Sequence, residues 1–353
     1  MNAFEGIIEG QALADWLALA CAAANGASLA IVDPAGHVLA GRLTEEGRPR
    51  VQEILLDGQR AGTIVASTGV PPGLLAVLAR SVELILTGVR NEAERARVGN
   101  ELAIGRRIQR SLLPRSFPEV EGWTFAAHYE PAREIGGDLF DIFRLRGDAR
   151  RIGILIADVT GKGIPAALLM ADVRALLHAA ADNADGPGDA LGRVNRILVA
   201  ERATSLFVTA ALLAVDVDSG AVRYASAGHE APLVARATGQ IDRLDAPGPI
   251  LGAFADGIFA EQTSVIEPGD AVLLYTDGLT EARNPDRHFY GEEALLATLG
   301  AARGGSAEAI KDSLVADVLA FRGDAEAFDD LTLLVARRRP RASHEGVAGR
   351  LVD

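Results

Sequence analysis

The sequence has 353 residues, which is enough for two domains of ordinary size. Its 48 acidic residues outnumber its 35 basic residues, and the net charge of −13 disfavours binding to nucleic acid. The only cysteine, Cys21, excludes an intrachain disulfide and a four-thiolate zinc site. The first residues do not resemble a secretion signal, and the longest apolar run, 206–215, is too short to span a bilayer. We therefore expect a cytoplasmic protein that does not bind membranes.

The first ninety residues predict a small domain that mixes helices and strands. A helix is expected over 11–24, and a strand over 27–33 that ends in a DPAG turn. Two further strand-like runs lie on either side of Gly58, as in a hairpin, and a second helix is expected from Pro71 to about Arg90. This order resembles an abbreviated GAF-like domain. We expect residues 1–90 to form a small α/β sensory or regulatory domain.

The second predicted helix continues into a segment with a heptad-like apolar pattern. Apolar residues recur at alternating steps of three and four, at Leu75, Leu78, Val82, Ile85, Val89 and Ala96. A short coiled coil would show this pattern, and so would an amphipathic helix that packs on its own domain. The following stretch, ELAIGRRIQRSLLP, carries an apolar stripe up to Pro114. We expect a helical linker over residues 91–114 and a homodimer that forms through it.

Residues 122–338 are rich in strand-like segments joined by short turns. We identify nine strand candidates there, with helices inserted at 164–182, 188–202, 291–300 and 306–321. Hairpin-linked strands with helices grouped in blocks favour an α+β sandwich over an alternating parallel sheet. The expected domain covers residues 115–339, and residues 340–353 are expected to be a mobile tail.

Acidic residues stand at the ends of four hydrophobic strands of this region. They are Asp138 and Asp141 in GGDLFD, Asp158 in ADVTGKG, Asp277 in LYTDG, and Asp329 and Asp330 in FDDLT. Each alone is an ordinary turn residue. If they converge, they repel by about 4 kcal/mol per pair at about 4 Å and a dielectric near 20, so they require cations. Because no histidines have metal-ligand spacing, the ligands are oxygens, which suit Mg²⁺ or Mn²⁺.

Seven segments occur in the order and approximate spacing of a known enzyme family. They are GGDLFDIF, ADVTGKGIPAALLM, TAALLAVDVDSGAVRYASAGHEAPLV, PGPILGAF, LYTDGLTEARN, YGEEAL and DDLTLLVAR. From about Glu101 to Arg338 the chain resembles the sporulation stage II protein E branch of the metal-dependent (PPM) serine/threonine phosphatases. The resemblance implies a sandwich of two antiparallel β-sheets flanked by helices, with a two-metal centre at one edge. Leu139 and Glu230 depart from the family pattern, and neither is a proposed ligand.

The resemblance also implies roles for the acidic residues. Asp158 would bridge two ions, Mn²⁺ or Mg²⁺, and Val159 would lend its backbone carbonyl. The catalytic and metal-binding set would be completed by Asp138, Asp277 and Asp329, with Asp330 holding or supplementing it. The implied reaction is hydrolysis of a phosphoserine or phosphothreonine monoester by metal-activated water. The implied substrate is a phosphorylated protein, such as an anti-sigma-factor antagonist in a bacterial partner-switching pathway.

Two other functions remain open at this point, and two local motifs do not support a function. A non-catalytic module would bind a phosphoprotein without hydrolysing it. A haloacid-dehalogenase-like phosphatase would use Asp216, since LLAVDVDSG imitates the nucleophile strand of that family. Gly161-Lys162-Gly163 does not fit a phosphate loop, because Ala157 stands where the motif requires glycine and neither Ser nor Thr follows the lysine. The loop residue His229 is more typical of a hydrogen-bonding histidine than of a general acid, so the predicted site excludes it.

Overall fold

The structure is a computed structural model that describes residues 11–24, 28–42, 48–133, 135–146, 150–201 and 206–340. The chain forms two compact units, residues 1–101 and 102–353. The boundary lies within one continuous helix, α2 (Pro72–Leu112), which includes most of the expected linker. Almost all of the predicted tail, residues 341–353, lies outside the described residues.

The first unit contains helix α1 (Gln11–Ala23), the beginning of α2 and a four-stranded antiparallel sheet. The strands, β1 (Leu29–Val32), β2 (Val38–Gly41), β3 (Arg50–Leu56) and β4 (Gln59–Ala66), lie in the order β2-β1-β4-β3. The predicted hairpin around Gly58 is formed by β3 and β4. Strand β2 was not predicted, because its four residues include no fully buried side chain and so lack a clear apolar alternation. The resemblance of this unit to a GAF-like domain stays a prediction.

The heptad-like pattern of α2 contributes to the core of the first unit. Leu75, Leu78 and Val82 are buried there, packed with residues of the sheet such as Ile54 and Ile64. These residues of the predicted coiled-coil seam therefore pack within their own chain and are not available to a second copy. Spacing by three and four identifies an apolar helix face, but it does not identify the partner of that face.

The second unit confirms the predicted α+β sandwich. Two five-stranded antiparallel sheets, β11-β10-β13-β14-β5 and β12-β9-β8-β7-β6, pack against each other. The strands are β5 (Trp123–Glu130), β6 (Leu139–Arg144), β7 (Arg151–Val159), β8 (Val208–Asp216), β9 (Ala221–Ala227), β10 (Leu233–Ala235), β11 (Ile241–Arg243), β12 (Gln262–Val265), β13 (Ala271–Tyr275) and β14 (Leu331–Arg338).

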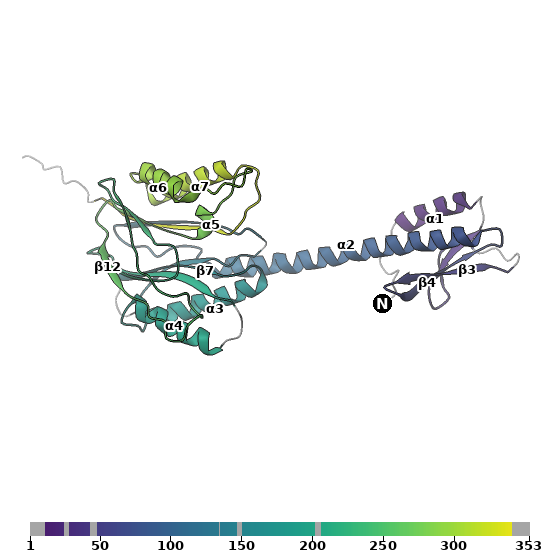
Figure 1. Ribbon diagram of the computed structural model, residues 1–353, viewed down its shortest axis with the longest axis horizontal. Coiled ribbons are helices and arrows are strands. Elements are labelled where there is room, and N and C mark those ends of the chain that lie inside the picture. Colours follow the sequence, from purple (N-terminus) through teal and green to yellow (C-terminus); the bar gives the residue numbers. More distant parts are fainter. Residues whose placement is uncertain are drawn as a thin grey trace, which may run out of the picture. The chain divides into compact units, whose positions relative to one another are not determined.

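Helices cover both outer faces of this sandwich, as Figure 1 shows. Helices α3 (Ile164–Ala181) and α4 (Pro187–Glu201) lie on the sheet that contains β7, and α6 (Gly291–Ala302) and α7 (Ala307–Arg322) lie on the sheet that contains β14. All four agree with the predicted helices to within two residues. A single turn, α5 (Asp277–Thr280), follows β13 and was not predicted.

Residues of the central strands alternate between two cores. In β13, Val272 and Leu274 pack between the sheets, whereas Leu273 and Tyr275 pack beneath α6 and α7. Because side chains alternate with a period of two, Thr276 continues the series that points between the sheets. Thr332 of β14 does the same, and both threonines are fully buried. Two hydroxyl groups are thereby placed inside one end of the sandwich.

The haloacid-dehalogenase-like interpretation is wrong, because that family requires a parallel sheet. Strand β8 pairs antiparallel with both β7 and β9, so Asp216 begins a hairpin. Its carboxylate accepts hydrogen bonds from the backbone and side chain of Ser219, 2.8 and 2.7 Å away. Asp216 also lies at the opposite end of β8 from the residue that pairs with Asp158. Its role is to close a turn.

Two of the described helices are long and apolar enough to be candidate membrane spans by length and composition alone. They are α2 and α3, whose best windows have mean hydropathies of 1.5 and 1.4. Core helices of soluble proteins pass the same test, and α3 buries Ala166, Met170, Val173 and Leu177 within the second unit. The expected absence of a membrane segment stays a prediction.

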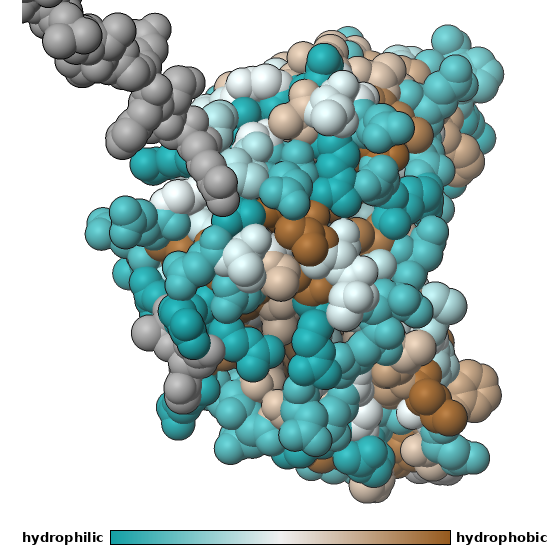
Figure 2. Space-filling view, turned by 90° about the vertical axis from the view of Figure 1, so that its left-hand side faces the viewer, coloured by the Kyte–Doolittle hydropathy of each residue, from teal (hydrophilic) through white to brown (hydrophobic). Residues whose placement is uncertain are grey.

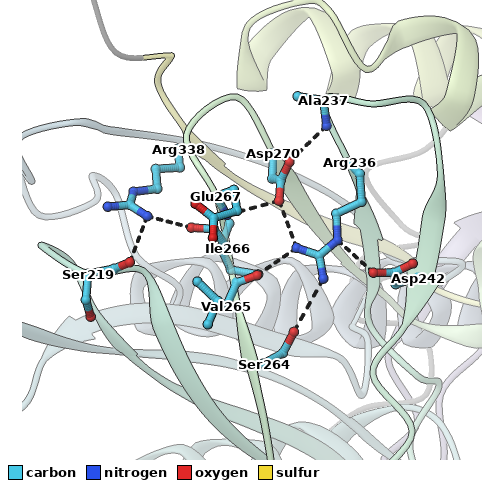
Figure 3. A network of polar contacts seen from close by, with 10 residues as sticks. All are labelled: Ser219, Arg236, Ala237, Asp242, Ser264, Val265, Ile266, Glu267, Asp270 and Arg338. Carbon is cyan, nitrogen blue, oxygen red and sulfur yellow. Dashed lines mark hydrogen bonds and ion pairs between the residues drawn. The ribbon is translucent and has the colours of Figure 1, made fainter.

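Two arginines connect the sheets at one end of the sandwich (Figure 3). Arg236, which follows β10, is paired with Asp242 and Asp270 and donates to the carbonyl of Val265 in the other sheet. Arg338, at the end of β14, is buried, and it donates to the carbonyls of Asp218, Ser219 and Ile266. The surface around β12 is mostly hydrophilic, with small groups of apolar side chains between the polar ones (Figure 2).

Arg338→Met is expected to destabilise the protein without changing its fold. The substitution leaves three carbonyl oxygens without their donor, which costs about 1 kcal/mol each and about 3 kcal/mol together. We expect the melting temperature of the second unit to fall by about 6 to 12 °C. The neighbouring Arg339 is exposed, so Arg339→Met serves as the matched control in the same calorimetric experiment. Equal melting temperatures for the two variants would contradict the proposed stabilising role.

Candidate active site

The acidic residues predicted from the sequence come together at one end of the sandwich. Asp158 is the last residue but one of β7, and Asp277, which follows the end of β13 after Thr276, is the first residue of α5. Asp329 and Asp330 directly precede β14, which pairs with β13. Asp138 precedes β6, whose first residue pairs with the residue before Asp158. Antiparallel pairing therefore places ends and beginnings of four strands at the same edge.

Asp138 is the most buried carboxylate of the cluster, with 1% of its surface exposed. Its Oδ2 accepts hydrogen bonds from the hydroxyls of Thr276 at 2.8 Å and Thr332 at 2.5 Å. Burial, and then the charges of Asp158 and Asp330, raise the pKa of Asp138 well above its usual value. The two threonines oppose this rise, because they stabilise the ionised form. A cation bound nearby would relieve the cost of ionising this carboxyl group.

Asp158 and Asp277 are half-buried and also hold protons more tightly than free aspartate. Burial, followed by the charges of Asp277 and Asp329, raises the pKa of Asp158 to about 7, although a hydrogen bond with Asp138 acts in the opposite direction. Burial, followed by the charge of Asp329, raises the pKa of Asp277 to about 6. These shifts have the signature of several carboxylates that share one poorly hydrated site.

Asp330 has a different task from the other acidic residues, because it holds a loop. Its Oδ1 accepts a hydrogen bond from the backbone N–H of Ala132 at 2.8 Å, and its Oδ2 accepts one from Gly137 at 2.6 Å. This fixes the segment that leads into Asp138. Of the two alternatives that the resemblance implies for Asp330, this arrangement agrees with holding the ligand set.

Gln109 holds the same loop from the other side, and the sequence analysis did not identify it. This residue lies near the end of α2 and is buried. Its amide nitrogen donates to the carbonyl of Gly136 at 2.5 Å, and its amide oxygen accepts from the N–H of Gly136 at 3.2 Å. The apolar stripe of ELAIGRRIQRSLLP was misleading here, because Ile104 and Ile108 are exposed whereas Gln109, which lies beside the stripe, is buried. The two-point contact connects this part of α2 to the backbone beside Asp138.

The arrangement around Gly137 suits a hard cation. A side chain at this position would meet the carbonyl of Val159 at 2.6 Å, Oδ1 of Asp158 at 3.4 Å and the carbonyl of Gly161 at 3.6 Å. Glycine thus leaves space within a group of carboxylate and carbonyl oxygens. Oxygen donors with surplus negative charge match the preference of Mg²⁺ and Mn²⁺, so the residues present fit such an ion.

The carboxylates form hydrogen bonds and ion pairs with other protein groups, and their oxygens are not arranged in a metal-coordination geometry. No three His, Cys, Asp or Glu side chains in the described ranges have the geometry to hold an ion together. Asp138 is bonded to threonines and to Asp158, and Asp329 is paired with Lys162, whose Nζ lies 2.9 Å from Oδ1. Metal binding would therefore require these side chains to exchange partners.

Asp141 does not belong to the site, although its motif includes Asp138. The side chain of Asp141 points toward α3, where it contacts Arg174 and lies 2.8 Å from Nε2 of His178. The alternation of β6 explains this difference. Both residues belong to one acidic motif of the sequence, but only Asp138 was predicted to be a ligand, which agrees with these positions.

His229, which was not included in the predicted site, lies one residue removed from the acidic cluster, because it contacts the strand partner of Asp158. Its Nδ1 is 2.7 Å from the hydroxyl of Thr209, the residue that pairs with Asp158 in the sheet. Burial lowers the pKa of His229 to about 4, so the ring is neutral. The carbonyl of Tyr275 lies near the ring, but the buried Nε2 makes no hydrogen bond of acceptable geometry. A histidine in a glycine-containing turn after a strand was the signal in the sequence.

Comparisons with known proteins give one family and several relatives. The family described as Stage II sporulation protein E (SpoIIE) matches residues 148–339. Protein IcfG of Synechocystis sp. (strain PCC 6803) is 31% identical over 266 residues, which cover 67% of this chain and 41% of IcfG. Phosphoserine phosphatase RsbU of Bacillus subtilis (strain 168) is 29% identical over 262 residues, which cover 72% of this chain and 73% of RsbU.

A solved structure supports the fold assignment. The SiaA-PP2C domain of Pseudomonas aeruginosa superposes with a TM-score of 0.60 and 22% sequence identity, over 69% of this chain and 98% of that domain. At this identity the likeness concerns the fold alone. Since the chain spans less than half of IcfG but nearly three quarters of RsbU, its relatives differ in what lies beyond the shared region.

Proposed function

Because the chain belongs to the stage II sporulation protein E (SpoIIE) family, we propose that it is a metal-dependent protein serine/threonine phosphatase. The observation that carries this proposal is the group of carboxylates at one end of the sandwich, in which Asp138, Asp158 and Asp277 all have raised pKa values. Carboxyl groups whose pKa values are raised by burial and by one another's charges favour the binding of divalent cations, which would neutralise those charges.

The proposed ligands are the residues identified from the sequence. Asp158 would bridge two ions, Mn²⁺ or Mg²⁺, and the other ligands would be Asp138, the Val159 carbonyl, Asp277 and Asp329. When bound, such ions lower the pKa of water and neutralise charge on a phosphoryl group. The protein orients these ligands: Thr276 and Thr332 fix the Asp138 carboxylate, while Asp330 and Gln109 fix the loop before it.

The proposed substrate is a phosphoserine or phosphothreonine in a protein. The name of RsbU, a phosphoserine phosphatase, supports this class of substrate. We further propose an anti-sigma-factor antagonist in a partner-switching pathway as the phosphorylated partner. The net charge of −13 is consistent with a cytoplasmic protein that binds no nucleic acid. Cations at the site would offset part of this charge before a phosphorylated partner approaches.

Homodimer formation through α2 remains part of the proposal, by a different face from the predicted seam. Val77, Leu84 and Val98 are exposed and lie seven or fourteen residues apart along the helix. A second copy of the chain would cover this face. The first unit, which we propose to be sensory, would then be positioned to influence the phosphatase through the same helix.

A hydrolysis assay tests the proposed function. We expect the purified full chain to hydrolyse p-nitrophenyl phosphate and a phosphoserine peptide only when Mn²⁺ or Mg²⁺ is added, and to lose this activity in EDTA. The alternative function, a non-catalytic module that binds a phosphoprotein, predicts binding of the peptide without release of phosphate. Metal-loaded protein that is folded and binds the peptide but releases no phosphate would favour the alternative.

A further inference from the structure

Lysine is rare in this protein, and one of its lysines lies beside the proposed metal centre. The chain has only two lysines, Lys162 and Lys311, among its 35 basic residues. Lys162 lies in the short loop between β7 and α3, four residues after Asp158. Lys311 lies on α7, where it is paired with Glu308 and Asp312. Lys162 is neither a proposed metal ligand nor one of the residues that orient the ligands.

The ammonium group of Lys162 takes the position of a cation on Asp329. Its Nζ lies 2.9 Å from Oδ1 of Asp329 and donates to the carbonyl of Phe328 at 2.6 Å. It also lies 5.4 Å from the centre of the Phe328 ring. A carboxylate and a carbonyl oxygen are donors that a hard divalent ion would also use.

The ion pair between Lys162 and Asp329 is partly exposed, so a divalent ion could reach the carboxylate and replace the ammonium group. The side chains of Lys162 and Asp329 are 31% and 35% exposed, so water screens their attraction. A divalent ion that contacts several carboxylates at once gains more than a single ammonium group does. Gly161 and Gly163, with φ values of 92° and 85°, flank the lysine in a backbone conformation that glycine adopts without strain.

We propose that Lys162 is an internal competitor for the metal centre, whose ammonium group must leave Asp329 before a divalent cation binds there. This inference rests on the proposed function, because it concerns the same carboxylates. In the metal-free protein, Lys162 neutralises Asp329 and fastens the loop after β7 to the segment before β14. When the cation binds, Asp329 changes partner and the lysine becomes accessible to solvent.

Amine acylation tests the displacement directly, with an internal control. The full chain is treated with a low dose of N-hydroxysuccinimidyl acetate in EDTA or in Mn²⁺, and acetylation of each lysine is measured by mass spectrometry. We expect Mn²⁺ to increase acetylation of Lys162 by about threefold or more relative to Lys311, because an ion-paired amine is less nucleophilic than a free one. An unchanged or lower ratio would overturn the proposal.

The variant Asp329→Asn gives the reverse test. Removal of the carboxylate charge is expected to raise acetylation of Lys162 in EDTA to the level that the wild type reaches in Mn²⁺. Addition of Mn²⁺ is then expected to have no further effect. If Lys162 of the variant remained as unreactive as in the metal-free wild type, Asp329 would not be the group that holds it, and the proposal would fail.

Titration calorimetry with Mn²⁺ separates this inference from the proposed function. We expect Lys162→Met to bind Mn²⁺ about 3- to 10-fold more tightly than the wild type, and Lys311→Met to bind it with unchanged affinity. Metal binding with equal affinity in all three proteins would overturn the inference and leave the phosphatase function intact. A wild type that binds no divalent ion would overturn the metal-dependent function as well.

Discussion

Asp158→Asn is expected to reduce metal-dependent phosphatase activity by about 10³-fold or more, because the proposed bridging position would lose its charge. The fold is expected to remain intact, because the amide has the same shape as the carboxylate. The ionised form of Asp158 is itself disfavoured by burial and by neighbouring charges, so a neutral side chain costs no stability at this position. The measurement is phosphate release from a phosphoserine peptide across a range of Mn²⁺ concentrations. Asp277→Asn is expected to behave similarly.

Asp216→Asn is the matched control, because it changes an aspartate at the other end of β8. Its carboxylate closes a hairpin turn with Ser219, so the substitution is expected to affect stability slightly and activity hardly at all. If Asp158→Asn kept full activity, the assignment of the metal centre would be wrong. If Asp216→Asn alone abolished activity, the purely structural role assigned to Asp216 would be wrong.

In EDTA, the protein is expected to become less stable as the pH rises from about 4 to about 8. The pKa of Asp158 is raised to about 7 and that of Asp277 to about 6, both from 3.8. Between the ordinary and the raised values, the folded state binds more protons at these two carboxyl groups than the unfolded state does, so their contribution to the free energy of unfolding falls with rising pH. His229, whose pKa is lowered to about 4, acts in the opposite direction up to about pH 6.5, but the two carboxyl groups together outweigh it. Above about pH 8 this contribution is lost and the curve flattens.

Saturating Mn²⁺ at pH 7.5 is expected to restore the lost stability, by about 2.7 kcal/mol at about a hundred times its Kd. Differential scanning calorimetry in EDTA and in Mn²⁺ over this pH range measures both effects. Asp158→Asn removes one of the titrating groups, so its curve in EDTA is expected to be flatter than that of the wild type. A wild-type melting temperature that stayed constant or rose between pH 5 and 7.5 in EDTA would contradict the proposed electrostatics.

The sandwich could be predicted from the sequence because most of its strands carry a clear signal. Strands such as β7 and β13 are continuous apolar runs that end at a turn or at an acidic residue. The elements that were missed have little internal pattern. Strand β11 has three half-exposed or exposed residues and owes its conformation to pairing with β10, and α5 is one turn long. Short elements depend on neighbours that a linear pattern does not reveal.

The acidic residues of the candidate site could be predicted because their position at strand ends is visible in the sequence. Their supporting residues could not. Gln109 contacts the backbone of Gly136, 27 positions away, and Thr276 contacts Asp138, 138 positions away. His229 contacts Thr209, the residue that pairs with Asp158. Lys162 likewise contacts Asp329 and the carbonyl of Phe328, and Phe328 lies 166 residues further along the chain. Only the folded chain identifies these pairs.

The central position of β14 has a consequence for synthesis of the protein. This strand is the last one in the part of the chain that the structure describes, yet it lies between β13 and β5, and β5 is the first described strand of the second unit. Until the ribosome has released residues 331–338, both neighbours present unpaired edges that are prone to association with other chains. Asp329 and Asp330 emerge just before β14. A nascent or truncated chain that ends before residue 329 therefore lacks a complete acidic cluster, and enzymatic competence can arise only after β14 has been synthesised.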